Sequence, residues 1–183
     1  MSFRSNTTLV SQSFNRAIVS LGANLESAVG TAEQTITYAI DKLRALSSGD
    51  FKASSLYLTS PIDCPPDTPD FVNGIVVMEV EGESTPEDFL QHLQSIEAAL
   101  GRVASPIKNA PRALDLDLIS FAEIRQSDAN LTLPHPRAAT RRFVLEPLAE
   151  LLPDLRLPGH TATVQELIAE LPEGQIVRRI PSL

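Results

Sequence analysis

The chain has 183 residues, of which 43% are hydrophobic and 21% charged, and its net charge is −8. A chain of this length buries enough surface to fold without disulfides, and its composition is that of an ordinary globular protein, so we expect one domain with extensions. The acidic balance disfavours a nucleic-acid or membrane-surface binder, because such proteins present a basic surface.

The two ends of the sequence are interpreted as extensions of a single domain over residues 16–172. Residues 1–15 are polar and lack the apolar segment of a signal peptide, so they predict a mobile leader, and residues 173–183 predict a tail. The sequence contains one cysteine, Cys64, in a proline-rich loop, which favours an incidental thiol over a nucleophile. No apolar run of about 18 residues occurs, so we expect a cytoplasmic protein without a membrane partner. We also expect a monomer.

The first half of the chain shows strand and helix periodicities in turn. Residues 17–21 predict a short strand, and apolar residues at helical spacing predict a helix over 25–46. Alternating residues predict a strand over 51–60, and β-branched residues predict another over 71–82. Four prolines between them, in "PIDCPPDTPD", exclude regular structure there and predict a loop.

The second half contains the clearest helix, predicted over residues 86–100. Thr85 is a candidate N-cap, and Pro86 suits the first helical position. The run "ALDLDLISF" predicts a strand over 113–121, followed by two helices over 141–152 and 163–171. The order β-α-β-β-α-β is the split βαβ arrangement, so we predict a ferredoxin-like α/β/α sandwich with a mainly antiparallel sheet and additional C-terminal helices.

Two aspartates lie one residue apart in the predicted strand "PRALDLDLI". Strand side chains alternate between faces, so Asp115 and Asp117 share one face, with Cα atoms about 7 Å apart, while the leucines share the other. Two like charges repel unless a cation lies between them. The pattern fits either a solvated outer face or a metal site.

Basic residues on both sides of the acidic pair favour the metal site. Cations gathered around paired acids are typical of a polyphosphate held through a divalent metal, with arginine side chains on its oxygens. The basic residues are Arg102, Lys108 and Arg112 upstream, and His135, Arg137, Arg141 and Arg142 downstream.

Six segments together resemble one known family. They are "SLGANL", "SSLYLTSPI", "PDFVNGIV", "IEAALGR", "APRALDLDLISF" and "LPHPRAATRRFVLEPLAEL". Across about residues 16–160 the chain resembles the 6-hydroxymethyl-7,8-dihydropterin pyrophosphokinases of the folate pathway. The resemblance implies a ferredoxin-like fold and transfer of pyrophosphate from ATP to the hydroxymethyl group of the pterin, with release of AMP.

The resemblance also implies roles at the phosphate end of the site. Asp115 and Asp117 would be ligands of two Mg²⁺ ions, and Arg102 and Arg112 would stabilise charge on the transferred group. The implied ATP contacts are Glu97, Arg102, Arg112, His135 and Arg141. From the residues alone, a hydrogen-bonded structural histidine and a solvated Glu97 remain alternatives.

For the pterin, the resemblance implies an aromatic sandwich with polar contacts to the ring edge. Phe71 and Phe143 would form the sandwich, although either could instead be a core residue. Asn73 shares a strand face with Phe71, and a ring edge would satisfy its amide. The other implied contacts are Gly22, where the backbone approaches the ring closely, and Thr59, Ser60 and Ile62. Tyr57 is interpreted as a packing residue.

Some positions depart from the family pattern. Asn109 and Ala110 replace a common Trp-Gly pair, Ala104 replaces a frequent basic residue, and Arg142 replaces a commonly small one. A non-catalytic or differently specific nucleotide- or pterin-binding paralogue and a two-metal phosphohydrolase remain alternatives. An RNA-binding module is disfavoured by the net charge of −8.

Overall fold

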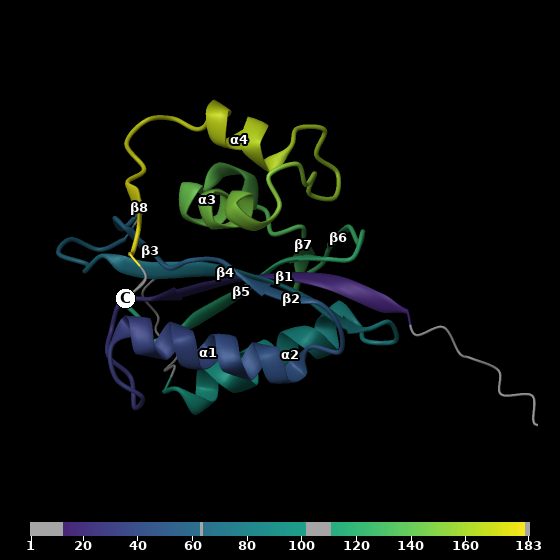
Figure 1. Ribbon diagram of the computed structural model, residues 1–183, viewed down its shortest axis with the longest axis horizontal. Coiled ribbons are helices and arrows are strands. Elements are labelled where there is room, and N and C mark those ends of the chain that lie inside the picture. The colour runs from purple at the N-terminus through teal and green to yellow at the C-terminus, as the bar shows by residue number, and fades with distance from the viewer. Residues whose placement is uncertain (1–12, 63, 102–110, 182–183) are drawn as a thin grey trace, which may run out of the picture.

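The structure is a computed structural model that describes residues 13–62, 64–101 and 111–181. Figure 1 shows a sheet with helices on both faces. Helices α1 (Ala32–Leu46) and α2 (Pro86–Ala99) cover one face, and α3 (Arg142–Leu151) and α4 (Val164–Glu170) cover the other. The expectation that the first two helices pack on a common face is confirmed. No helix in these described ranges is long and apolar enough to cross a membrane.

The main sheet has the strand order expected for the fold class. Its order is β5-β1-β4-β3-β8, with β2 also pairing with β4, and the pairings within the described residues are antiparallel. The predicted ferredoxin-like α/β/α sandwich is therefore confirmed. The strands are β1 (Phe14–Ala23), β2 (Phe51–Ala53), β3 (Tyr57–Thr59), β4 (Phe71–Glu81), β5 (Asp115–Phe121) and β8 (Val177–Arg179).

Three short elements lie outside this sheet. Strands β6 (Gln126–Ser127) and β7 (Thr132–Leu133) pair with each other, and the 3-10 helix η1 (Ala138–Thr140) precedes α3.

Helices α1 and α2 both have a threonine at the N-cap position. Thr85 accepts the backbone N–H of Asp88 at 3.1 Å, as its position predicts. Thr31 and Gln34 form a capping box at the start of α1. The helix therefore begins at Ala32 rather than at residue 25, because a turn closed by Ser27 and Gly30 occupies the preceding residues.

The single strand expected over 51–60 is wrong. Strands β2 and β3 both pair with β4, but Ser54 interrupts them. Its hydroxyl accepts the backbone N–H of Ile75 at 2.9 Å and donates to the carbonyl of Ser55 at 2.7 Å. A serine side chain thus replaces a backbone carbonyl in the ladder, which ends β2.

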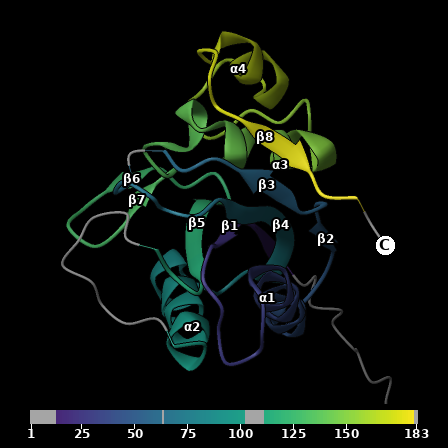
Figure 2. The same ribbon diagram turned by 90° about the vertical axis from the view of Figure 1, so that its left-hand side faces the viewer.

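The C-terminal segment, expected to be a tail from residue 173, contains a strand. Residues Val177–Arg179 form β8 at the outer edge of β3, with Thr59 opposite Val177. Figure 2 shows β8 beside β3, on the side of the sheet where α3 lies.

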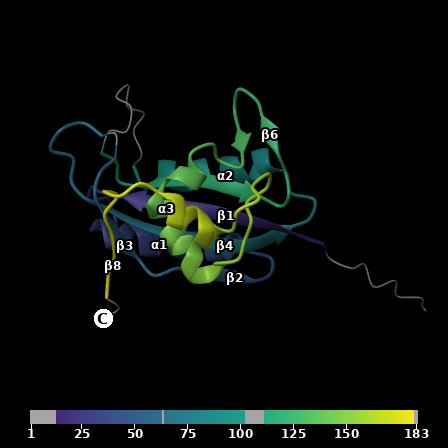
Figure 3. The ribbon, with the colours of Figure 1, turned by 90° about the horizontal axis from the view of Figure 1, so that it is seen from above.

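The sheet separates two hydrophobic cores. Val19, Leu21 and Leu116 point toward α1 and α2, whereas Ile18 and Ile119 point toward α3 and α4. Figure 3, viewed from the α3 side, shows that these two helices cover only part of their face. The remaining part of this face carries the polar residues described next.

Candidate active site

Polar residues occupy one end of the sheet face that α3 covers. Gly22 at the centre pairs with Asn73 of β4 on one side and with Asp115 of β5 on the other. Two residues before Gly22 on β1, Ser20 is opposite Asp117. Two residues beyond Asn73 and Asp117, the same strands place Ile75 and Ile119 in the core beneath α3. The face thus changes from core to site within single strands.

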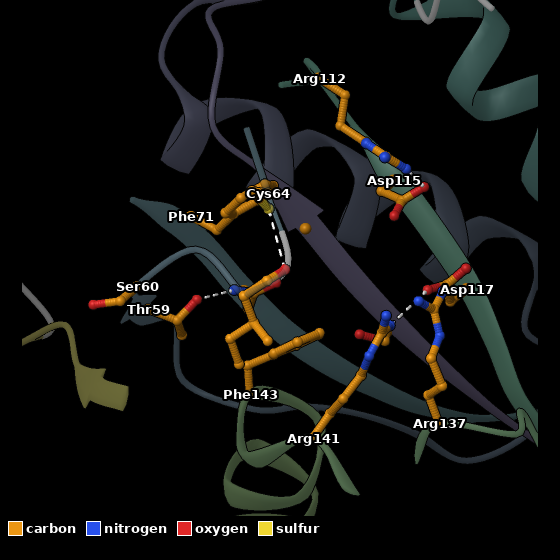
Figure 4. Close-up of a pocket in the computed structure, with 14 residues that line it drawn as sticks. Thr59, Ser60, Cys64, Phe71, Arg112, Asp115, Asp117, Arg137, Arg141 and Phe143 are labelled. Carbon is orange, nitrogen blue, oxygen red and sulfur yellow. Dashed lines mark hydrogen bonds and ion pairs between the residues drawn. The ribbon is translucent and has the colours of Figure 1, made fainter. Parts of the chain in front are cut away.

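Ser20, Gly22, Asn73, Asp115 and Asp117 line one cavity of about 160 Å³. It brings together all seven residues expected to contact the pterin, both aspartates, and three of the arginines expected near them. Figure 4 shows Phe71, Thr59 and Phe143 at one end and the acidic pair at the other. The lining residues are Ser20, Gly22, Thr59, Ser60, Ile62, Cys64, Phe71, Asn73, Arg112, Asp115, Asp117, Arg137, Arg141 and Phe143.

The aromatic end of the cavity contains two half-buried rings from separate elements. Phe71 begins β4, and Phe143 lies in the first turn of α3, where it also packs against the second core. The guanidinium carbon of Arg141 lies 5.2 Å from the ring centroid of Phe143. Both rings line the cavity, where aromatic side chains can contact a flat ligand.

A buried amide lies beside the two rings. Asn73 is 4% exposed, and its Nδ2 donates to the hydroxyl of Thr59 at 2.7 Å. A Cβ added to Gly22 would lie 2.9 Å from Oδ1 of Asn73, closer than side chains tolerate. Glycine at position 22 therefore makes room for the amide in its observed orientation.

The acidic end holds each aspartate next to an arginine. Nη1 of Arg112 lies 2.9 Å from Oδ1 of Asp115, and Nη1 of Arg141 lies 3.9 Å from Oδ2 of Asp117. Burial, followed by the nearby Asp115 carboxylate, raises the pKa of Asp117 above its usual value. The nearby basic residues thus compensate the charge of Asp117 only in part, and a bound cation would favour its ionised form.

His135 lies close to the acidic pair. Its Nδ1 accepts the backbone N–H of Arg137 at 3.2 Å, which leaves the proton of the neutral ring on Nε2. Burial lowers the pKa of His135, although the Asp117 carboxylate opposes this shift. The neutral ring can therefore donate a hydrogen bond through Nε2.

Glu97 is not a solvated residue, so that alternative is wrong. It is 3% exposed, and its Oε1 accepts the backbone N–H of Leu116 at 2.7 Å. Glu97 and His135 line a second, more open cavity of about 610 Å³, and Asp117 lines both cavities. Any role of Glu97 in binding must be compatible with its contact to β5.

Several residues of the site are not indicated as such by the sequence. Ser20 and Cys64 line the cavity, and Arg137, expected only as one of the basic residues near the acidic pair, lines it too and extends toward Asp117. Asn24 binds two segments together: Oδ1 accepts the backbone N–H of Arg112 at 2.8 Å, and Nδ2 donates to the carbonyl of Pro69 at 3.2 Å. The motif "SLGANL" could have indicated Asn24, since a buried amide requires partners.

Tyr57 does more than pack. Its hydroxyl donates to Glu150 of α3 at 2.8 Å, and Glu150 also accepts from the backbone and hydroxyl of Ser55. Burial, together with this hydrogen bond, raises the pKa of Tyr57 to about 12. Arg179 of β8 completes the cluster at 3.5 Å from Glu150. The cluster joins β3, α3 and β8.

Some expected site residues lie outside the described ranges. Arg102, to which a catalytic role was assigned, is among them, as are Lys108, Asn109, Ala110 and Ala104. Within the described ranges, no group of three or more His, Cys, Asp or Glu side chains could hold a metal. Asp115 and Asp117 form a two-carboxylate set, which is typical of Mg²⁺ that takes its other ligands from substrate phosphates and water.

Comparison with known proteins relates the chain to one family. A family model described as 7,8-dihydro-6-hydroxymethylpterin-pyrophosphokinase (HPPK) matches residues 18–153. A Pseudomonas aeruginosa protein named 2-amino-4-hydroxy-6-hydroxymethyldihydropteridine pyrophosphokinase is 39% identical over 168 residues, which cover 91% of this chain and 97% of that protein. A Synechocystis protein of the same name is 36% identical over 160 residues, covering 87% and 78% of the two chains.

Solved structures support the fold. The crystal structure of wild-type Plasmodium falciparum HPPK-DHPS with pteroate matches with a TM-score of 0.65 at 14% identity. The match covers 87% of this chain but 45% of that one, so the chain spans less than half of the solved protein. At this identity the likeness concerns the fold alone.

Proposed function

The chain belongs to the 7,8-dihydro-6-hydroxymethylpterin-pyrophosphokinase family, and we infer from this that it transfers pyrophosphate from ATP to the hydroxymethyl group of that pterin. In the reaction, the hydroxyl oxygen attacks the β-phosphorus of ATP, and the bond from this phosphorus to the oxygen shared with the α-phosphate breaks. AMP leaves with that oxygen, the pterin diphosphate forms, and the hydroxyl proton is released. The protein is thus a transferase of folate synthesis with ATP as co-substrate.

One observation supports this function most directly: a single cavity combines a ring site with a phosphate site. The ring site consists of Phe71, Phe143 and the buried amide of Asn73, and the acidic pair and three arginines lie at the other end. A pterin held between the rings would direct its hydroxymethyl group toward Asp115 and Asp117. Proximity of the two reacting groups is a large part of catalysis in such transfers.

We propose that the ring site binds the pterin through stacking and edge contacts. Phe71 and Phe143 stack on its faces, and Asn73 contacts its polar edge in the orientation that Thr59 and Gly22 set. Ser60 and Ile62 line the same end of the cavity and complete the edge contacts.

We propose that Asp115 and Asp117 hold two Mg²⁺ ions together with the phosphates of ATP. The fit rests on the chemistry of these residues: two half-buried carboxylates lie on one strand face, and burial and the Asp115 carboxylate raise the pKa of Asp117 despite the nearby arginines. When bound, Mg²⁺ neutralises and aligns the triphosphate. Arg141 and Arg112, which contact the carboxylates, are within reach of the same phosphates.

We propose that the nucleotide extends from this cavity into the neighbouring one. Asp117 lines both cavities, and His135 lines the second, where Nε2 can donate to a phosphate oxygen. Arg102 and Arg112 are proposed to stabilise charge on the transferred group. Glu97 is proposed to contribute to nucleotide binding through its position beside β5.

The deciding experiment measures AMP release from Mg-ATP with and without the pterin alcohol. AMP formation that requires the pterin supports the proposal. Release of inorganic phosphate or pyrophosphate without the pterin would instead indicate a phosphohydrolase, and substrate binding without any product would indicate a non-catalytic paralogue.

We further propose that the protein acts as a monomer in the cytoplasm on small molecules alone. The net charge of −8 supports the absence of a nucleic-acid partner. Light scattering on the purified protein tests the monomer, and a filter-binding assay with RNA tests the absence of nucleic-acid binding.

A further inference from the structure

The side chain of Gln175 bridges the backbone on both sides of Arg141. Its Oε1 accepts the backbone N–H of Arg142 at 2.7 Å, and its Nε2 donates to the carbonyl of Thr140 at 3.1 Å. One side-chain amide, 33 residues away in the sequence, thus binds the last residue of η1 and the first residue of α3, at the junction between these two elements.

This junction has no cap of its own. Arg141 is the N-cap residue of α3, and its side chain makes no capping hydrogen bond. The N–H of the first helical residue has no carbonyl partner within the helix, so a side chain from elsewhere can bind it. Gln175 supplies this partner for the first residue of α3, while the Arg141 side chain remains directed toward Asp117.

The residues held by this junction belong to the proposed site. Nη1 of Arg141 lies 3.9 Å from Oδ2 of Asp117. The guanidinium carbon of Arg141 lies over the ring of Phe143, 5.2 Å from the ring centroid. Both side chains line the cavity. A change in the backbone of residues 140–142 therefore moves a phosphate-end residue and a ring-end residue together.

The residues that follow Gln175 bind the opposite wall of the cavity. The carbonyl of Ile176 accepts the backbone N–H of Ser60 at 3.2 Å, and Val177 pairs with Thr59 across β3 and β8. Ser60 lines the cavity, and Thr59 binds the amide of Asn73. Residues 175–177 therefore connect the start of α3 to β3 on the two sides of the cavity. Figure 2 shows β8 between these two elements.

We propose that Gln175 is a positioning residue for Arg141 and Phe143, and that the C-terminal segment 175–179 is part of the catalytic unit. The proposal rests on the function proposed above. It places a functional element beyond residue 153, where the match to the family model ends, and beyond the domain boundary expected at residue 172. Gln175 acts through the backbone that it holds and contacts no substrate itself.

The first test replaces Gln175 by alanine in the full chain. We expect kcat/KM to fall about tenfold for both ATP and the pterin, because small displacements of substrate-positioning groups have large effects on rate. The matched control is Gln165→Ala, which makes the same substitution at an exposed glutamine of α4 and should change neither value. If Gln175→Ala only lowers Tm and leaves both kcat/KM values within about twofold of the parent, the proposal is wrong.

A second variant separates positioning from simple helix capping. Gln175→Glu keeps an acceptor for the N–H of Arg142 but sets a carboxylate against the carbonyl of Thr140. We expect its Tm to stay near that of the parent, while kcat/KM still falls severalfold. Full activity in Gln175→Glu would show that only the cap matters and would overturn the proposal.

A double-mutant cycle identifies the route of the effect. If Gln175 acts through Arg141, adding Gln175→Ala to Arg141→Ala should change the affinity for a non-hydrolysable ATP analogue less than it does in the parent. Equal effects in both backgrounds would contradict the proposal. Amide hydrogen exchange of residues 138–145, which needs no activity, should be faster in Gln175→Ala. Unchanged exchange overturns this inference, whereas an inactive parent with faster exchange overturns only the proposed function.

Discussion

Gly22 and Asn73 are paired across β1 and β4, and the amide oxygen of Asn73 lies 2.9 Å from the place where a Cβ on residue 22 would be. The glycine therefore sets the orientation of the amide, and the amide in turn lies at the ring end of the cavity. The first prediction follows from this contact.

Gly22→Ala should weaken pterin binding about tenfold and leave the affinity for ATP unchanged. The new methyl group displaces the Asn73 side chain from its hydrogen bond with Thr59, which costs on the order of 1 kcal/mol. Gly74→Ala, next to Asn73 on β4, is the control, because its Cβ would lie 3.4 Å from its nearest neighbour. Fluorescence titration with the pterin distinguishes the two. Equal affinities for the pterin in both variants would contradict the role of Gly22.

Removing a ring or the amide should affect the pterin and not the nucleotide. Phe71→Ala or Asn73→Ala should weaken pterin binding by about 1–3 kcal/mol, from lost stacking or from a lost polar contact. Calorimetric titration with the pterin and with an ATP analogue measures both affinities. A folded variant with parent affinity for the pterin would show that the ring binds elsewhere.

The acidic pair should be essential for turnover. Asp117→Ala or Asp115→Ala should remove most pyrophosphoryl transfer, while pterin affinity largely survives because its contacts lie at the other end of the cavity. Normal turnover of Asp117→Ala in Mg-ATP would exclude the metal assignment.

The raised pKa of Asp117 also predicts how stability depends on pH. The folded state binds the Asp117 proton more tightly than the unfolded state, so the stability from this group is full below the usual value of 3.8 and is lost as the pH rises through the folded pKa. At neutral pH without metal, Asp117→Asn should therefore raise Tm, by about 2–4 °C. Thermal melts from pH 3 to 8 in a chelator test this, and Mg²⁺ with an ATP analogue should reverse the order. A lower Tm for Asp117→Asn in the chelator would contradict the inference that burial makes the ionised Asp117 unfavourable.

Asn24 should position Arg112 for the reaction. Asn24→Ala removes the hydrogen bonds to Arg112 and Pro69, so kcat should fall about tenfold and stability should fall by about 1–2 kcal/mol. Asn15→Ala is matched to it, since Asn15 lies near the other end of β1, which Asn24 directly follows, and donates to two backbone carbonyls. Denaturant unfolding and steady-state rates should show a similar loss of stability in both variants, with a lower kcat in Asn24→Ala alone. A parent-like kcat in Asn24→Ala would remove Asn24 from the site.

Local pattern in the sequence determined much of the fold. Apolar periodicity located the strands around β1, β4 and β5 and the helices after them, and Thr85 was recognised as an N-cap because capping involves residues three apart. The alternation of "LDLD" placed Asp115 and Asp117 on one face without any tertiary information, since strand geometry alone requires it. The family motifs selected most of the residues that the structure gathers around one cavity.

Only the tertiary structure decided which contacts hold these residues in place. Four features have no local signature: the break at Ser54, the strand β8, the hydrogen bond from the backbone N–H of Arg112 to Asn24 across 88 positions, and the bridge from Gln175 to residues 140–142. The physical reason is that each of these features depends on a hydrogen-bond partner distant in sequence. The partner is the facing strand for β8 and a polar side chain in the other three cases, and periodicity carries no information about it. The sequence by itself thus determined the elements, the chemistry of the site and the shared face of the acidic pair, whereas long-range hydrogen bonding decided how the walls of the cavity are held together.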